Sequence, residues 1–296
     1  MNSSAESSAL TRRPVLGALG ALAAASLGGT AGCMSWPEPT VPMRVRHIAA
    51  RCAPQRRVVL LPGVRSLADD FVHEGFVAQL QRAAPACEVL LADAHLGYFV
   101  EGQLLRRLRD DVLRPAVVPV GGGRTAANDA TNSATSSATH RAALERPWLV
   151  GVSLGGLMAL AYAMRHGDEL AGVLAIAPYL GQRTLLRDIS AAGGPLAWSR
   201  RPPPAHLEPH EATEHALWRW FASPGFGTAH PTVHLAFGRN DRFGDALRVL
   251  QSLLPADHTD VIDGRHTWAP WRVLWQRWLD RGLLAAPALG CGPTQL

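Results

Sequence analysis

The alternation of continuous apolar runs with helically spaced apolar residues is the feature that most constrains the fold of this chain. Residues 57–61, 147–152 and 172–177 form apolar runs of strand length, as expected of strands that are buried on both faces of a sheet. Between successive runs, apolar residues recur at helical spacing, for example along residues 154–166. Because the two patterns alternate repeatedly, the sequence predicts the α/β class: a mainly parallel sheet with helices on both faces and no second domain.

The same patterns give approximate limits for the elements. The expected strands are residues 43–47, 57–61, 88–92, 147–152, 172–177, 233–237 and 258–262. In the first of them, other residues alternate with arginines, which is typical of a half-exposed edge strand. The first expected helix begins with a Ser-x-x-Asp cap at Ser66 and Asp69 and has Leu67, Phe71 and Leu80 on one side. Further helices are expected around residues 104–112, 154–166, 244–254 and 269–283.

Composition excludes several reaction classes. The 296-residue chain contains no lysine, so all 29 basic residues are arginine, and a P-loop lysine, a pyridoxal Schiff base and a lysine nucleophile are excluded together. The net charge of +5 is scattered along the chain without interleaved aromatic residues, which argues against nucleic-acid binding. Hydrophobic residues make up 47% of the chain, enough for a full-sized core.

The N-terminus has the pattern of an export signal over residues 1–32. Arg12 and Arg13 precede an Ala/Leu/Gly-rich run that is short for a membrane-spanning helix. The paired arginines resemble a twin-arginine signal, and Ala31-Gly32-Cys33 resembles the end of a lipoprotein box. We therefore expect an exported protein of the periplasm or cell envelope. Its mature chain is either anchored to the membrane through a lipidated Cys33 or released after ordinary cleavage.

The remaining cysteines, Cys52, Cys87 and Cys291, lack C-x-x-C spacing and histidine partners at ligand spacing. A zinc or iron–sulfur site is therefore not expected. An exported location permits a disulfide between Cys52 and Cys87, although three separate thiols is the favoured interpretation.

Residues 120–142 interrupt the pattern with Gly, Ala, Thr, Ser and Asn. Such a stretch buries too little apolar surface to offset its ordering entropy, so a disordered surface loop is expected there.

Gly151-Val152-Ser153-Leu154-Gly155 places a serine between an expected buried strand and an expected helix, in a G-x-S-x-G frame. A serine on such a tight strand-to-helix turn takes a strained backbone angle, and the flanking glycines remove side chains that would clash. The five-residue motif alone is a weak signal. Its position between a strand and a helix predicts a nucleophile elbow. A helix cap is the alternative role for Ser153.

With this motif, the mature chain, residues 33–296, resembles the α/β-hydrolase superfamily. In that family the nucleophile, the acid and the histidine follow one another along the chain, the last two after late strands. Asp241 follows the strand expected at 233–237, and His266 follows the last strand. The resemblance therefore implies an α/β-hydrolase fold with Ser153, Asp241 and His266 as a catalytic triad. It also implies a cap insertion at about residues 179–231.

The chemistry of these side chains assigns their roles. Serine is a poor nucleophile at neutral pH, so His266 takes its proton, and Asp241 orients and stabilises the imidazole. The resemblance places the two oxyanion donors at the backbone N–H groups of Leu154 and Val64, after a Pro62-Gly63 turn where the family often has His-Gly.

Other assignments stay open for several residues. Asp245 or Asp263 could replace Asp241 as the acid, whereas His234 and His258 lie within expected strands and fit the histidine role less well. Asp93 and His95 follow a parallel strand at the edge where such folds bind ligands, and they either line the site or are solvated loop residues.

Two further clusters favour structural roles. His210 and His215 are five residues apart, whereas the zinc helix motif needs four, so a polar cap segment is favoured over a metal site. The tryptophan stripe Trp268, Trp271, Trp275 and Trp278 has the spacing of a core-facing helix side. The run from Gly264 to Trp268 also resembles a Gly-x-His-x-Trp segment of some esterase-type members of the superfamily, which supports His266.

The expected function is that of an exported serine hydrolase that needs no cofactor or metal and cleaves a small-molecule or lipid-like carboxylic ester through an acyl-enzyme. Aromatic residues of the insertion either form an apolar acyl site or fasten the insertion to the body. Thioester cleavage, amide cleavage and acyl transfer use the same triad and are the alternative reactions. The alternative outside the enzymes is an inactive envelope binding protein of the same fold.

Overall fold

The computed structural model of the chain describes residues 37–114, 144, 146–228 and 231–285. The predicted signal segment 1–32, Cys33, Cys291 and the loop predicted at 120–142 lie outside these residues. The described residues belong to one compact unit, Trp36–Leu296. Among them, no helix has both the length and the apolar character needed to cross a membrane.

A seven-stranded sheet forms the centre of this unit, with strand order β1-β3-β2-β4-β5-β6-β7. All neighbouring strands run parallel except β1, which pairs antiparallel with β3 at one edge. This arrangement confirms the predicted mainly parallel sheet and the predicted edge strand. The strands are β1 (Val45–Ile48), β2 (Arg56–Leu61), β3 (Cys87–Ala92), β4 (Trp148–Val152), β5 (Gly172–Ile176), β6 (Thr232–Gly238) and β7 (Thr259–Ile262).

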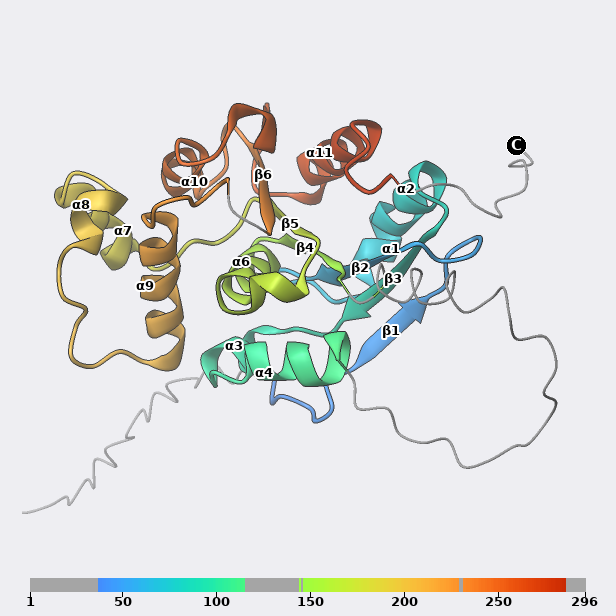
Figure 1. Cartoon of the computed structure of the whole chain (residues 1–296), viewed down its shortest axis with the longest axis horizontal. Helices are drawn as coiled ribbons and strands as arrows, with labels where there is room; N and C mark the ends of the chain where they lie inside the picture. The colour runs from blue at the N-terminus through green and yellow to red at the C-terminus, as the bar shows by residue number, and fades with distance from the viewer. Residues whose placement is uncertain (1–36, 115–143, 145, 229–230, 286–296) are drawn as a thin grey trace, which may run out of the picture. The chain divides into compact units, whose positions relative to one another are not determined.

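Helices cover both faces of the sheet, as predicted: α2 and α11 lie over one face, and α3, α4 and α6 over the other (Figure 1). The helices are α1 (Asp70–His73), α2 (Phe76–Ala83), α3 (Leu96–Val100), α4 (Leu104–Arg107) with its π-helical continuation η1 (Leu108–Leu113), α6 (Leu154–His166), α7 (Arg183–Ala191), α8 (Pro195–Ser199), α9 (Pro209–Phe221), α10 (Gly244–Gln251) and α11 (Trp268–Asp280). Short 3-10 turns follow α6 at Gly167–Glu169 and precede β7 at Ala256–His258.

The helix predicted from Ser66 is wrong in its first half. Asp69 is the N-cap of α1 without a side-chain cap bond, and Leu67, expected in the core, is 69% exposed. Gly75 has φ +80°, a left-handed conformation that ends α1 and separates it from α2. Phe71 and Leu80 are fully buried, as expected, because α1 and α2 still turn these side chains towards the sheet.

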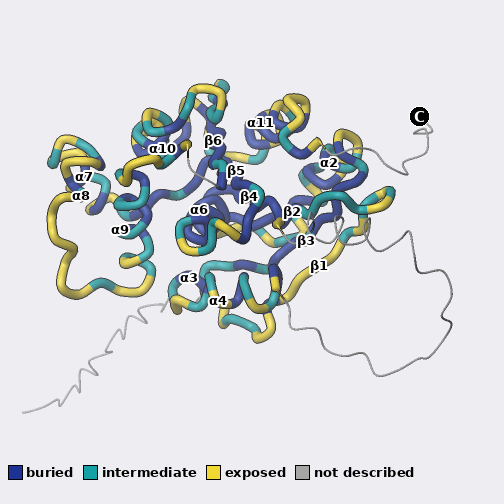
Figure 2. The backbone as a smooth tube through the Cα atoms, viewed as in Figure 1, coloured by how far each residue is buried: buried dark blue, intermediate teal, exposed yellow. Residues whose placement is uncertain are grey.

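The tryptophan stripe of α11 packs on the core, as predicted. Trp275 stacks on Phe76 of α2 with ring centroids 5.6 Å apart, and its indole N–H donates to the Phe76 carbonyl at 3.0 Å. Trp271 and Trp278 are also buried. Every residue of β4 and β5, in the middle of the sheet, is buried (Figure 2).

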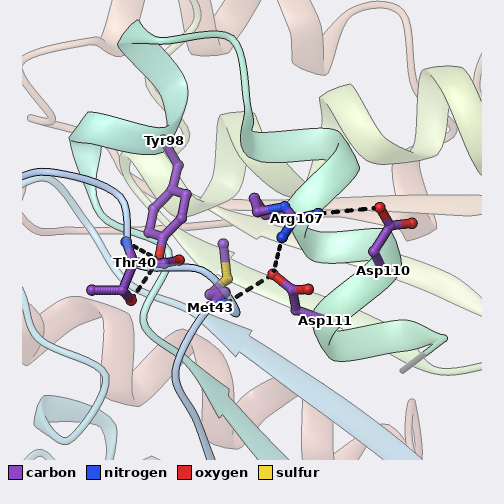
Figure 3. A network of polar contacts seen from close by, with 6 residues as sticks. All are labelled: Thr40, Met43, Tyr98, Arg107, Asp110 and Asp111. Atoms are coloured by element: carbon purple, nitrogen blue, oxygen red, sulfur yellow. Dashed lines mark hydrogen bonds and ion pairs between the residues drawn. The ribbon is translucent and has the colours of Figure 1, made fainter. Parts of the chain in front are cut away.

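Polar contacts fasten the segment before β1 to the helices that follow β3 (Figure 3). The Tyr98 hydroxyl donates to the Thr40 carbonyl at 2.8 Å, and the Met43 N–H donates to Asp111 Oδ2 at 2.8 Å. Arg107, which is almost fully buried, pairs with the same Asp111 oxygen at 3.2 Å. The chain entering the edge strand is thereby held against α3 and η1.

The cysteines differ from expectation. Cys87 is a free, buried thiol whose pKa burial raises to about 12, so it is not bridged to Cys52. Cys52 is disulfide-bonded, so the favoured interpretation of three separate thiols is wrong.

A buried histidine in β6 generates a prediction about stability. The ring centroid of His234 lies 4.7 Å from those of both His258 and Trp278, and its Nδ1 has no hydrogen-bond partner among the residues that the structure describes. Burial, with a smaller contribution from His258, lowers the pKa of His234 to about 4. In the unfolded chain a histidine titrates near its ordinary value of about 6.5.

We expect the free energy of unfolding to fall as the pH decreases from 6.5 to 4, because His234 then binds a proton in the unfolded chain but not in the native protein. His234→Phe should lose this part of the pH dependence. Urea unfolding at a series of pH values measures the difference between the two proteins. Equal slopes for wild type and variant in this window would contradict the prediction.

Candidate active site

Ser153 occupies the turn between β4 and α6 in a conformation that few non-glycine residues adopt. Its φ is +53° and its ψ is −115°. The turn holds it there: its N–H donates to the Ile176 carbonyl at 2.9 Å, and its own carbonyl accepts from the N–H groups of Gly156 and Tyr179 at 3.0 Å each. Such strain persists only where surrounding contacts fix the backbone, and it marks functional sites more often than others.

The two glycines of the G-x-S-x-G frame allow α6 to start directly against the sheet. A Cβ atom at Gly151 would collide with the carbonyl of Gly155, and one at Gly155 would collide with the carbonyl of Leu61 at the end of β2. Both obstacles are backbone atoms, which cannot move aside as a flexible side chain can. The frame is therefore a packing requirement of this turn.

The structure brings Ser153, His266 and Asp241 into one hydrogen-bonded chain. His266 Nε2 lies 2.9 Å from Ser153 Oγ, and His266 Nδ1 lies 2.8 Å from Asp241 Oδ2. His266 is in the loop after β7, and Asp241 is in the loop after β6. This arrangement can move a proton from the hydroxyl to the imidazole and stabilise the charged ring that results.

The two alternative acids lie elsewhere. Asp245 pairs with Arg248, and Asp263 pairs with Arg239 at 3.0 Å, and both carboxylates are exposed to solvent. Asp241 has a fully buried carboxylate, whose second oxygen accepts from the Phe243 N–H at 2.9 Å. Both of its oxygens thus have a partner, and its orientation toward the imidazole is fixed.

Two aromatic rings enclose the His266 imidazole. Phe243 and Trp271 each approach it edge to face, with ring centroids 4.9 Å away. The imidazole is 9% exposed, so the hydrogen bonds on both sides of it are shielded from water and are correspondingly stronger. The sequence pattern identified Trp271 only as a core residue and gave no signal for Phe243, because neither contact follows from spacing along the chain.

A cavity of about 480 Å³ opens onto Ser153. Val64 and Leu154, the predicted oxyanion donors, line it together with apolar side chains of α3, including Leu96 and Phe99. Within the described part of the chain, the N–H groups of Val64 and Leu154 donate to no backbone carbonyl. They are the groups that a substrate oxygen beside Ser153 could use.

The insertion between β5 and β6 supplies another wall of this cavity. Tyr179, Gln182, His210 and Glu214 line it. Glu214, on α9, is 2% exposed, and burial raises the pKa of its carboxyl group although the Gln182 N–H donates to it at 2.9 Å. The sequence showed Glu214 only as part of a polar stretch, since its burial depends on how α9 packs on the segment after β5.

Most aromatic residues of the insertion fasten it internally. Trp220, Phe221 and Phe226 pack on one another with centroids 4.9–5.6 Å apart. The Trp218 indole donates to the Leu180 carbonyl at 2.7 Å, and Trp218 lines a second cavity next to the first.

Asp93 and His95 do not line the cavity at Ser153. His95 is instead the N-cap of α3, where its Nδ1 accepts from the Gly97 N–H at 3.2 Å. In the described ranges, no group of three or more His, Cys, Asp or Glu side chains is placed to hold a metal ion.

The tight start of α6 can be tested by Gly155→Ala. Because the new Cβ meets the Leu61 carbonyl, α6 must shift, and we expect a loss of about 1–3 kcal/mol in the free energy of unfolding. Urea unfolding measures it, with Ser190→Ala on the exposed side of α7 as a control that should change stability by less than about 0.5 kcal/mol. A Gly155→Ala protein as stable as the control would refute the close approach.

Comparison with known proteins shows that this chain is similar in fold to solved structures. No family model matches the chain, and no curated protein sequence matches it. The structure is similar to the S-formylglutathione hydrolase of Staphylococcus aureus, with a TM-score of 0.50 and 13% identity over 83% of this chain and 94% of that one.

Two other solved structures are similar at lower TM-scores. Fluorophosphonate-binding serine hydrolase F of Staphylococcus aureus has a TM-score of 0.48 and 14% identity, covering 81% of this chain and 91% of its own. The monoacylglycerol lipase of Paleococcus ferrophilus has a TM-score of 0.47 and 15% identity, covering 80% and 98%.

Proposed function

We propose that this chain, which has the α/β-hydrolase fold, is a serine hydrolase that cleaves a carboxylic ester through an acyl-enzyme. The observation that carries the proposal is the hydrogen-bonded chain Ser153–His266–Asp241 at the mouth of a cavity. Nucleophile, base and orienting acid lie within hydrogen-bond reach of one another, which is the geometry that nucleophilic catalysis by serine requires.

The reaction follows from this geometry. His266 Nε2 accepts the Ser153 hydroxyl proton as Oγ attacks the ester carbonyl, and the Asp241 carboxylate stabilises the imidazolium that forms. The N–H groups of Val64 and Leu154 stabilise the negative charge on the former carbonyl oxygen. His266 then protonates the departing alcohol, leaving an acyl group on Ser153. A water molecule activated by His266 attacks that ester and releases the acid.

The apolar lining of the cavity supports an ester with an apolar group next to the scissile bond as the substrate, since Leu96, Phe99 and Val100 line the space beside Ser153. Cleavage of a thioester or an amide, and acyl transfer to an alcohol, would use the same three side chains. Assays with matched oxygen esters, thioesters and amides, and with an added alcohol acceptor, separate these reactions.

We also propose that the protein is exported and that Cys33 carries a lipid anchor in the cell envelope. The proposal rests on the paired arginines and on Ala31-Gly32-Cys33 in the sequence. The disulfide bond of Cys52 supports export, because disulfides persist mainly in oxidising compartments outside the cytosol, but it does not bear on the lipid. Mass spectrometry of the mature N-terminus would show a diacylglyceryl mass on Cys33, or an unmodified N-terminus if the anchor is absent.

Covalent labelling tests the nucleophile. A fluorophosphonate probe should label the wild-type protein, because Ser153 is activated by His266, and it should not label Ser153→Ala. Ser252→Ala, at the end of α10, is the matched control and should label like wild type. A folded wild-type protein that does not react would favour an inactive binding protein of the same fold.

Asp241→Asn tests the acid. Loss of the carboxylate leaves the imidazole in the wrong tautomer, so we expect kcat for an activated ester to fall by about 10³–10⁴-fold. Asp245→Asn and Asp263→Asn, which remove exposed carboxylates of the same type, should stay within a few-fold of wild type. A large loss in either of these, with activity kept in Asp241→Asn, would reassign the acid.

A further inference from the structure

A second cavity, of about 960 Å³, adjoins the cavity at Ser153. The two share a wall, because five residues line both of them: Tyr179, Gln182, Arg183, Arg242 and Phe243. The second cavity lies between α7 and α9 of the insertion and α10 of the body. The two cavities therefore lie next to each other along these five residues.

The second cavity has an apolar wall and a cationic rim. Its apolar side chains include Leu186 and Ile189 of α7, Trp218 of α9, and Val249 of α10. Its cationic side chains are Arg183, Arg187 and Arg242, which are all exposed to solvent. Such a cavity combines a surface for hydrocarbon with groups that bind an anion.

In the part of the chain that the structure describes, the arginines of the rim differ from many others in having no acidic partner. Arg239, Arg248 and Arg277 each form an ion pair with an aspartate. Among the residues that the structure describes, no carboxylate pairs with Arg183, Arg187 or Arg242. Their guanidinium groups are available to an anionic ligand.

Arg242 is the rim residue closest in the chain to the proposed machinery. It follows Asp241 directly, and its guanidinium carbon lies 4.7 Å from the centroid of the Phe243 ring. Phe243 in turn packs on the His266 imidazole. Stacking on Phe243 thus positions this positive charge at the shared wall.

The carboxyl groups that line the cavities do not cancel this charge. Asp245 is paired with Arg248, so its charge is compensated locally. Glu214 is buried and accepts from the Gln182 N–H, and burial raises its pKa, which disfavours its charged form. The junction of the two cavities is therefore positive on balance.

We propose that the substrate is a negatively charged, amphiphilic ester whose anionic group is bound by Arg183 and Arg242. Its scissile carbonyl lies at Ser153, and its hydrocarbon part lies along the apolar wall of the second cavity. This inference rests on the proposed hydrolase function and adds a substrate class to it. Arginine suits the role because its planar guanidinium can bind a carboxylate or phosphate through two hydrogen bonds.

Matched ester pairs test the proposal, with a carboxylate as the anionic probe. In one pair the charge is on the acyl side: a nitrophenyl monoester of a dicarboxylic acid is compared with the methyl ester of the same compound. In the other pair the charge is on the alcohol side: hydroxybenzoate acylated on its hydroxyl group is compared with methyl hydroxybenzoate that carries the same acyl group. The ratio of kcat/KM, anionic over neutral, is measured for both pairs at low salt.

We expect the wild-type ratio to be about tenfold or more in at least one pair, which also identifies the side of the ester that carries the charge. In Arg183→Gln/Arg242→Gln the ratio should fall to near one. In Arg165→Gln, which removes a positive charge at the far end of α6, the ratio should stay at the wild-type value. High salt should reduce the wild-type ratio, because exposed charges are screened.

The outcomes separate this inference from the proposed function. A wild-type protein that reacts with the fluorophosphonate probe and hydrolyses charged and neutral esters equally in both pairs would overturn the anionic substrate and leave the hydrolase in place. A preference that persists in the double arginine variant would overturn the assignment to Arg183 and Arg242. A folded protein that neither reacts with the probe nor hydrolyses any ester would overturn both.

Discussion

The close approach of α6 to the sheet is the constraint on which the rest of the site depends. With only hydrogen atoms at Gly151 and Gly155, the first turn of α6 can lie against the carbonyl ends of β2 and β4. The chain must then turn sharply between β4 and α6, and Ser153, at the apex, takes a positive φ. The same sharp turn places its side chain at the opening of the cavity and the Leu154 N–H beside it. One steric requirement thus presents both a hydroxyl and a hydrogen-bond donor to a ligand.

Parallel strands bring His266 and Asp241, the residues hydrogen-bonded in series to Ser153, to this turn. β4 to β7 are consecutive neighbours in the sheet, so their carboxyl ends lie along one edge. Ser153, Asp241 and His266 each follow one of these strands, and residues 113 positions apart in sequence lie within hydrogen-bond distance. The resemblance to the α/β-hydrolase superfamily singled out these residues, and the shared edge of a parallel sheet is the physical reason that their loops can meet.

Predictions that depended on local conformation or on side-chain neighbours were less successful. The helix expected from Ser66 begins only at Asp70 and is separated from α2 by Gly75, and a glycine within an apolar pattern does not reveal its own φ. The disulfide bond of Cys52 was not favoured by cysteine spacing. Phe243 and Glu214 carried no sequence signal, although one packs on the imidazole and the other lies buried in the cavity wall. The surroundings of Phe243 and Glu214 depend on contacts between segments that are far apart in the chain.

The sequence by itself determined the parallel sheet, its helical layers and the elbow at Ser153. Hydrophobic periodicity reports which face of a segment is buried, and a glycine frame reports where backbone must approach backbone; both are local properties of the chain. Only the tertiary structure decided what surrounds the serine: two adjoining cavities, a ring cage around the imidazole and a rim of arginines that have no acidic partner among the described residues. The second cavity arises where α7, α9 and α10 meet, and the ring cage forms because Phe243 and Trp271 of α11 converge on His266. Which side chains face a shared space is set by the relative placement of elements, a property that no single stretch of sequence encodes.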